Sequence, residues 1–144
     1  TQFKADFVIL EGYIKFSGEL LRLSLLALGG FGTLLLIRLK NETGAEFLKH
    51  SDFLIVSLIS MICFAFCSVA CLFHRYHASD SMSWYISWLR AEKENKKEKA
   101  STEYRGLKKS FKRSGLALII SQIFFVSGVL FFIIAITLLI KKVM

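Results

Sequence analysis

Two long stretches of the chain carry no charged residue. The first covers residues 53–73 and the second covers residues 116–140, which are 21 and 25 positions respectively. Because a helix rises about 1.5 Å per residue, each stretch can cross the roughly 30 Å hydrocarbon core of a bilayer. The pattern therefore predicts an integral membrane protein with spanning helices at both places.

A third apolar stretch is shorter and has charges at its edge. Residues 23–37 are uncharged but too few to cross a bilayer alone. Extended back to Ser17, the stretch becomes long enough, and it then includes Glu19 and Arg22. These two side chains are three residues apart and can pair on a helix, which lowers their cost in the membrane. We therefore predict a first spanning helix at residues 17–39.

The residues before this span follow a helical period. Lys4, Glu11, Lys15 and Arg22 share one face of a helix, whereas most apolar side chains fall elsewhere. The pattern predicts an amphipathic helix over residues 1–16 that continues directly into the first span. No small-residue cleavage site follows, so we expect the first span to act as its own insertion signal.

Residues 74–115, between the second and third spans, are basic and also follow a helical period. An aromatic start with Trp84 and Trp88 on one face leads into a charged run of good helix formers. The Ala-Ser-Thr sequence at 100–102 is typical of a turn with a helix cap, and Ser-Asp-Ser at 79–81 is a candidate helix break. We predict a helical hairpin that turns at 100–102.

Together these elements predict an all-α membrane protein with three transmembrane helices. The chain contains no proline, which suits long unbroken helices, and no alternating strand pattern recurs. The remaining segments are a predicted external loop at 40–52 and a predicted external tail at 141–144.

Positive charge orients the predicted spans. Residues 74–115 hold 11 of the 19 Lys and Arg residues. With the N-terminus and this segment in the cytosol, 14 of the 19 lie inside, as the positive-inside rule requires. We therefore predict a multi-pass protein of the inner (plasma) membrane with a cytosolic N-terminus, a cytosolic hairpin and an external C-terminus.

Small residues recur every seven positions through the third span, at Ser114, Ser121, Gly128 and Ala135. Helices in lipid associate by close approach across small residues, and a seven-residue period suits a left-handed crossing of about 20°. The stripe therefore predicts a packing seam. Its partner helix could belong to the same chain or to another copy.

The second span carries Cys63, Cys67 and Cys71 at four-residue intervals, with His74 just beyond. Thiolates and an imidazole at such spacing could bind Zn²⁺ or Cu(I). Three thiols on one straight helix extend over about 12 Å, however, and cannot all reach one ion. We interpret the cysteines as small packing residues and expect no metal and no cofactor.

Three polar side chains in the predicted spans are candidates to line a water path: Glu19, Arg22 and Gln122. Polar groups at membrane depth usually face the protein interior or water. The alternative for Glu19 and Arg22 is a position at the headgroups, where a long side chain can reach water.

The predicted hairpin carries 11 Lys and Arg residues against five Asp and Glu, a net charge of +6. This charge could attract anionic lipid headgroups, at about 1 kcal/mol per cation, or the phosphates of a nucleotide or nucleic acid. Alternatively, the positive charge could serve only to orient the protein in the membrane. The candidate contacts are Lys96, Lys97, Lys108, Lys109, Lys112 and Arg113.

Catalytic signatures are missing from the sequence. It has no phosphate-loop glycine motif, no nucleophile elbow and no zinc-protease motif. Little of the chain lies outside the predicted membrane region. We expect no catalytic residue and no enzymatic activity.

The stretch WYISWLRAEKENKKEKASTEYRGLKKSFKRSG, followed directly by the third span, resembles small bacterial membrane effectors of the SLATT type. The resemblance lies in the order of the elements. It implies spanning helices joined to basic cytosolic helices, which assemble into pores that act in antiviral defense. The family pattern has two main spans, so a third, N-terminal span departs from it, and no functional residue is carried over.

These observations favour a small protein that self-assembles into a pore or ion channel, with the basic hairpin as its gate or sensor. Three helices cannot readily enclose a polar lumen, so ion transport would require a homo-oligomer, which is generally cyclic. The alternative is a non-catalytic accessory or assembly subunit of a larger membrane complex. A transporter is disfavoured by the small size and the few polar groups within the spans.

Overall fold

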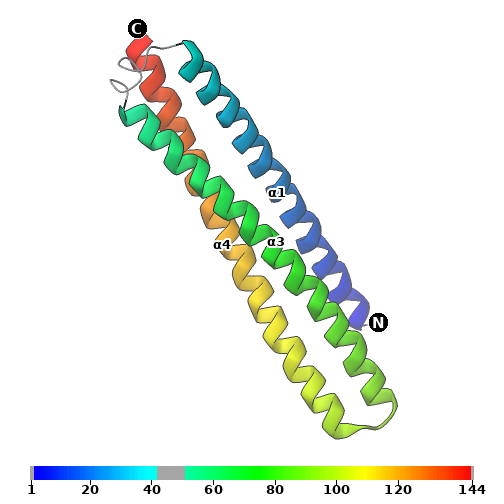
Figure 1. The fold of residues 1–144 in the computed structure, drawn as a ribbon. Helices are drawn as coiled ribbons and strands as arrows, with labels where there is room; N and C mark the ends of the chain where they lie inside the picture. The colour runs from blue at the N-terminus through cyan, green and yellow to red at the C-terminus, as the bar shows by residue number, and fades with distance from the viewer. Residues whose placement is uncertain (1, 42–50, 144) are drawn as a thin grey trace. The chain divides into compact units, whose positions relative to one another are not determined.

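The computed structural model describes the backbone of residues 2–41 and 51–143, and every long element within them is helical (Figure 1). The helices are α1 (Gln2–Asn41), α3 (Ser51–Lys93) and α4 (Lys97–Val143). Each is long and apolar enough to cross a membrane. The predicted all-α fold with three spanning helices is therefore confirmed. The predicted loop at 40–52 and the tail at 141–144 lie largely outside the residues whose side chains are described.

Helix α1 runs without a break through the predicted boundary at residue 16. On its exposed face, Lys15 Nζ lies 3.0 Å from Glu11 Oε1. Leu10 is buried on another face. The predicted amphipathic segment is thus the first part of one long helix, although the side chain of Lys4 lies outside the described part.

The chain forms two compact units, and each contains part of all three helices. The first unit combines Thr1–Glu19 with Ala70–Ile120, and the second combines Leu20–Val69 with Ser121–Met144. We call them the hairpin unit and the span unit. The hairpin unit holds most of the basic residues, and the span unit holds most of the uncharged stretches.

Serine hydroxyls join the helices of the span unit. Ser24 Oγ of α1 lies 2.8 Å from Ser68 Oγ of α3, and both side chains are buried. Ser60 Oγ of α3 donates to the carbonyl oxygen of Gly128 in α4 at 2.8 Å. In hydrocarbon there is little hydrophobic driving force for helices to associate. Hydrogen bonds and close contacts of this kind therefore hold the unit together.

Aromatic rings fill the space beside these serines. Phe31 of α1 meets Phe132 of α4 edge to face, with ring centroids 4.5 Å apart. Two further pairs join α3 to α4: Phe64 with Phe125 at 5.9 Å, and Phe66 with Phe124 at 5.3 Å. The phenylalanines of the third span therefore contact both other helices of the same copy.

The small-residue stripe of α4 is buried within a single copy. Ser114, Ser121, Gly128 and Ala135 are all buried. At Gly128, an added Cβ atom would lie 3.0 to 3.2 Å from ring carbons of Phe64. The partner of the stripe at this point is therefore α3 of the same chain.

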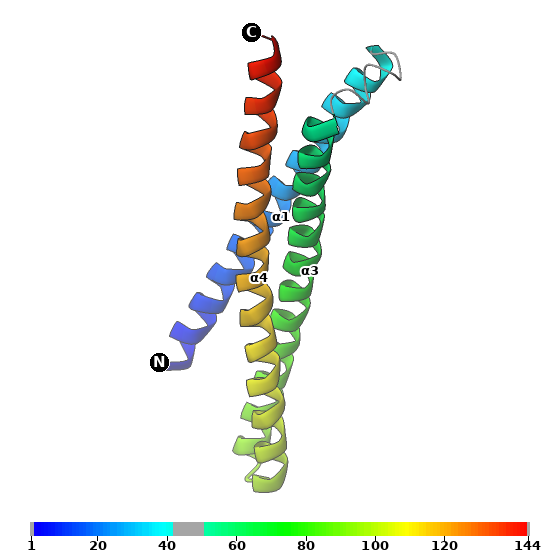
Figure 2. The same ribbon diagram turned by 90° about the vertical axis from the view of Figure 1, so that its left-hand side faces the viewer.

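The turn between α3 and α4 lies at residues 94–96, so the predicted turn at 100–102 is wrong (Figure 2). Asn95 has a φ of 56°, Lys96 N–H donates to Ala91 O, and Asn95 N–H donates to Glu92 O. This is a Schellman motif, in which Asn is one of the few residues that accept the left-handed conformation. Thr102, expected near a cap, instead donates its hydroxyl to Glu98 O within α4.

The predicted break at 79–81 is also absent, because α3 is continuous from Ser51 to Lys93. The polar side chains of this stretch find partners without opening the helix. Ser81 Oγ donates to Ala78 O at 2.7 Å, and Asp80 accepts hydrogen bonds through its carboxylate. Residues that often end a helix are therefore accommodated inside this one.

The contact at Gly128 can be tested by filling it. We expect Gly128→Leu to lower the free energy of unfolding by about 1–3 kcal/mol, because the new side chain meets the buried Phe64 ring. Gly115→Leu is the control in the same helix, since a Cβ atom there meets nothing within 4 Å. Thermal unfolding in detergent measures both. Equal stability of the two variants would contradict the close packing.

Candidate ligand-binding groove

In the hairpin unit, a hydrogen-bonded cluster around one carboxylate joins the parts of α3 and α4 on either side of the turn, which we call the two arms. Asp80 Oδ2 of α3 accepts hydrogen bonds from Ser110 Oγ of α4 at 2.7 Å and from Trp84 Nε1 at 3.2 Å. The His77 carbonyl oxygen lies 3.1 Å from Ser110 Oγ as a second acceptor. We call Asp80, Trp84 and Ser110 the Asp80 cluster.

Next to this cluster, the arms approach closely through a glycine. A Cβ atom added at Gly106 of α4 would lie 2.7 Å from a ring carbon of Trp84, which no side chain tolerates without movement. Further toward the turn, the rings of Trp88 and Tyr104 lie 5.9 Å apart. The positions of α3 and α4 in the hairpin unit are therefore set by aromatic contacts and by the carboxylate.

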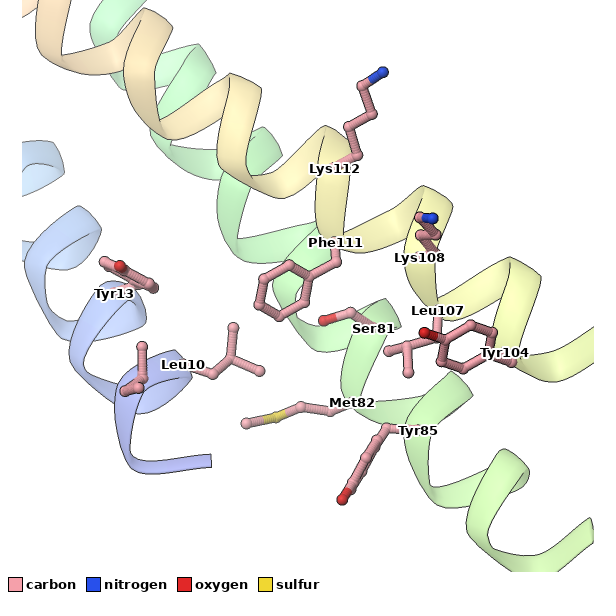
Figure 3. Close-up of a pocket in the computed structure, with 11 residues that line it drawn as sticks. Leu10, Tyr13, Ser81, Met82, Tyr85, Tyr104, Leu107, Lys108, Phe111 and Lys112 are labelled. Atoms are coloured by element: carbon pink, nitrogen blue, oxygen red, sulfur yellow. The ribbon is translucent and has the colours of Figure 1, made fainter. Parts of the chain in front are cut away.

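The hairpin unit contains a groove of about 700 Å³ between the first part of α1 and the two arms (Figure 3). Its lining comes from all three helices and is mostly apolar and aromatic. The lining residues are Ile9, Leu10 and Tyr13 of α1, Ser81, Met82 and Tyr85 of α3, and Tyr104, Leu107, Lys108, Phe111 and Lys112 of α4.

The side chains of Leu10, Met82 and Phe111 point toward one another across the groove (Figure 3). Leu10 is buried, whereas half of the Phe111 surface remains exposed. Lys108 and Lys112 stand one helical turn apart on the α4 rim, and in Figure 3 the Lys112 side chain extends outward. The groove thus combines an apolar floor with two cations at one edge.

The six basic candidates differ in their surroundings, although all six are exposed. Only Lys108 and Lys112 line the groove. Lys96, at the turn, is 2.7 Å from Glu94 Oε2. The hydrogen bond from Lys96, together with its charge, lowers the pKa of the Glu94 carboxyl. Lys96 is therefore already engaged by a neighbouring carboxylate.

The three candidates for a water path are exposed on the single copy. Glu19, Arg22 and Gln122 all present their side chains to the outside. Neither Glu19 nor Arg22 forms an ion pair within the described part of the chain. The pairing that their spacing allows is therefore not seen among the described residues of a single copy.

The cysteines of α3 lie on a buried face. Cys63, Cys67 and Cys71 are buried together with Ser60 and Ser68 of the same helix. Among the described residues, no three His, Cys, Asp or Glu side chains come close enough to hold a metal ion. The three cysteines thus have the surroundings of small packing residues.

Two buried histidines follow the second span, and no sequence pattern marks them as a site. His74 and His77 are both buried, and both ring nitrogens of His77 lack a hydrogen-bond partner. The His77 ring is instead flanked by Phe73, at 4.5 Å, and Tyr76, at 5.3 Å. The His77 imidazole therefore packs as an aromatic side chain. The backbone oxygens of His77 and His74 accept hydrogen bonds from Ser110 and Ser114, respectively.

Comparison with known proteins finds no matching family model, no matching curated protein and no matching solved structure. The function is therefore inferred from the groove and from the exposed polar side chains.

We expect Asp80→Ala to reduce the free energy of unfolding by about 1–3 kcal/mol, because the indole N–H of Trp84 loses its acceptor and the Ser110 hydroxyl keeps only the His77 carbonyl oxygen. Asp80→Asn retains an oxygen acceptor and should lose less. Thermal unfolding and tryptophan emission measure the change, with Ser79→Ala, at an exposed neighbouring position, as the control. An unchanged melting temperature for Asp80→Ala would show that the cluster does not hold the two arms together.

Proposed function

We propose that this multi-pass membrane protein self-assembles into a pore whose opening is controlled through the hairpin unit. The observation that supports the proposal is the exposure of Glu19, Arg22 and Gln122 on a single copy. A charged or amide side chain that faces lipid is costly, so these groups favour contact with water or with another copy.

The interior of the span unit supports assembly rather than a pore through one chain. Ser24, Ser60 and Ser68 are buried and hydrogen bonded between helices, and Phe31 and Phe64 occupy the space around them. Side chains therefore fill the middle of the unit. A path for ions would run between copies, most simply around the axis of a cyclic ring.

The continuity of the helices supports control by the hairpin. Helix α3 runs unbroken from Ser51 to Lys93, and α4 runs unbroken from Lys97 to Val143. Continuous helices of this kind can carry a change at one end to the other. A ligand on the hairpin unit could thereby bias the arrangement of the spans.

The proposed orientation follows the charge distribution, with 14 of 19 Lys and Arg residues on the cytosolic side. The N-terminus and the hairpin would be cytosolic and the C-terminus external, in the inner membrane. The basic helices followed by the third span resemble the order of elements in SLATT-type effectors, from which the N-terminal span departs, so we propose a permeabilising role in antiviral defense, without enzymatic activity.

Orientation can be tested by labelling in whole cells. A single cysteine introduced by Lys96→Cys, in a background with the three native cysteines replaced by Ala, should resist a membrane-impermeant thiol reagent until the cells are opened. Position 96 is exposed, so access depends on the membrane alone. Labelling of intact cells would show that the hairpin is external and would reject the proposed orientation.

Assembly and ion flow can be tested together with pure protein. We expect a defined homo-oligomer in detergent and ion flux from liposomes that contain the protein. Gln122→Leu should reduce the flux several-fold, because it removes the amide from the proposed path. The control is Ile123→Leu, which changes an exposed apolar neighbour without removing a polar group.

A monomeric mass without flux would reject the pore and favour the accessory-subunit alternative. In that case the exposed polar side chains would contact a different membrane protein. An oligomer whose flux is unaffected by Gln122→Leu, but altered by Glu19→Gln, would move the path to the α1 side of the spans.

A further inference from the structure

The groove of the hairpin unit leaves aromatic and aliphatic surface uncovered. Ile9 and Tyr104 are each 53% exposed, Phe111 is 50% exposed and Tyr13 is 46% exposed. These residues fall outside the uncharged stretches that cross the bilayer. Apolar surface of this extent, gathered in a concave site, is characteristic of a binding site.

The charge of the lining restricts what can bind there. Among the side chains that the structure describes, none of those lining the groove is acidic, whereas Lys108 and Lys112 stand on its rim. Neither lysine forms an ion pair within the described residues. Two ammonium groups that have no ion-pair partner in the described part of the chain, on residues one turn apart, are complementary to a single anionic group such as a phosphate or a carboxylate.

The rest of the lining favours an alkyl chain over a nucleotide. The walls are helices, whose backbone donors and acceptors are already used within the helices. The Ser81 hydroxyl is engaged with Ala78 O. Besides the two lysines, the lining that the structure describes offers a base and a ribose only the hydroxyls of Tyr13, Tyr85 and Tyr104. Polar groups of a nucleotide that found no partner there would be costly, whereas an alkyl chain against apolar side chains needs none.

The size of the groove and its position along α4 also favour a ligand with an alkyl chain. About 700 Å³ lies in the range of sites for small ligands, roughly 300–1,000 Å³, and is too small for a two-chain phospholipid. Lys112 precedes the uncharged stretch at 116–140 by four residues, about 6 Å along the helix. An anionic group held there lies close to the depth of lipid headgroups.

We propose that the groove between α1 and the two arms binds a single-chain anionic amphiphile from the bilayer, with its phosphate or carboxylate at Lys108 and Lys112 and its alkyl chain against Leu10, Met82 and Phe111. Binding itself does not depend on the pore. The role of this ligand as the signal that opens or closes the pore rests on the proposed function.

The test uses the full-length protein in a neutral detergent and a 16-carbon lysophosphatidylglycerol as the probe, with native mass spectrometry to count bound molecules and to titrate affinity. We expect one probe molecule per chain. Lysophosphatidylcholine, which has the same chain and no net charge, should bind more weakly, and glycerol phosphate, which has no chain, should not bind.

Variants separate the groove from general attraction to a basic surface. Lys108→Gln with Lys112→Gln should weaken binding of the probe by about tenfold or more, because both cations that face its anionic group are removed. Lys99→Gln with Arg105→Gln removes the same charge from the same helix, at exposed positions that do not line the groove, and should change affinity less than about twofold. Phe111→Ala should weaken long-chain probes more than short-chain ones.

Three outcomes would overturn the site. Equal losses of affinity in the two double variants would show unspecific attraction to a basic surface. Equal affinity for lysophosphatidylcholine would show that the lysines do not recognise the anionic group. Displacement of the probe by ATP would make the groove a nucleotide site. The flux assay distinguishes the two proposals. Binding without any effect on flux would leave the groove intact and reject gating, whereas flux without binding would leave the pore intact and reject the groove.

Discussion

Close approach of helices across small residues is the constraint on which the span unit depends. Hydrocarbon surrounds the outer surface of spanning helices, so burial of apolar groups between them gains little. The helices are therefore held together mainly by close contact and by hydrogen bonds. Gly128 provides both, because the absent side chain admits the Phe64 ring and exposes a carbonyl oxygen that accepts from Ser60. The span unit accordingly buries several serines, a residue that is mostly exposed in globular proteins.

The spans were predictable because an uncharged run of this length, in a chain without proline, is typical of a helix that crosses a bilayer. The turn was not, because its signal is one asparagine inside a charged run. Asn95 accepts the left-handed conformation, and only the Schellman hydrogen bonds distinguish it from any other surface residue. At Asp80 the opposite happened, because a helix break was predicted where the helix continues. A residue that often breaks helices becomes compatible with one when Ser110 and Trp84 donate to it.

The groove was beyond sequence reasoning for a different reason. Tyr104, Leu107 and Phe111 recur at helical spacing, but this spacing indicates only that they share a face. What makes a site of them is the presence of Leu10 and Met82 from two other helices. Likewise, six basic residues are equivalent in the sequence, and the structure distinguishes Lys108 and Lys112 by bringing apolar residues of α1 and α3 beside them.

The same three helices that form the groove walls also form the span unit. Helices α1, α3 and α4 each contribute residues to both, and each is continuous between them. A chain inserted between Leu10 and Phe111 would separate α1 from α4, while the Asp80 cluster keeps α3 and α4 in register. Within the hairpin unit, α1 is therefore the helix that such a ligand would displace. Because α1 carries Glu19 and Arg22, a shift of this helix would move two of the three candidate groups for the proposed path, which is how an amphiphile in the groove would influence the proposed pore.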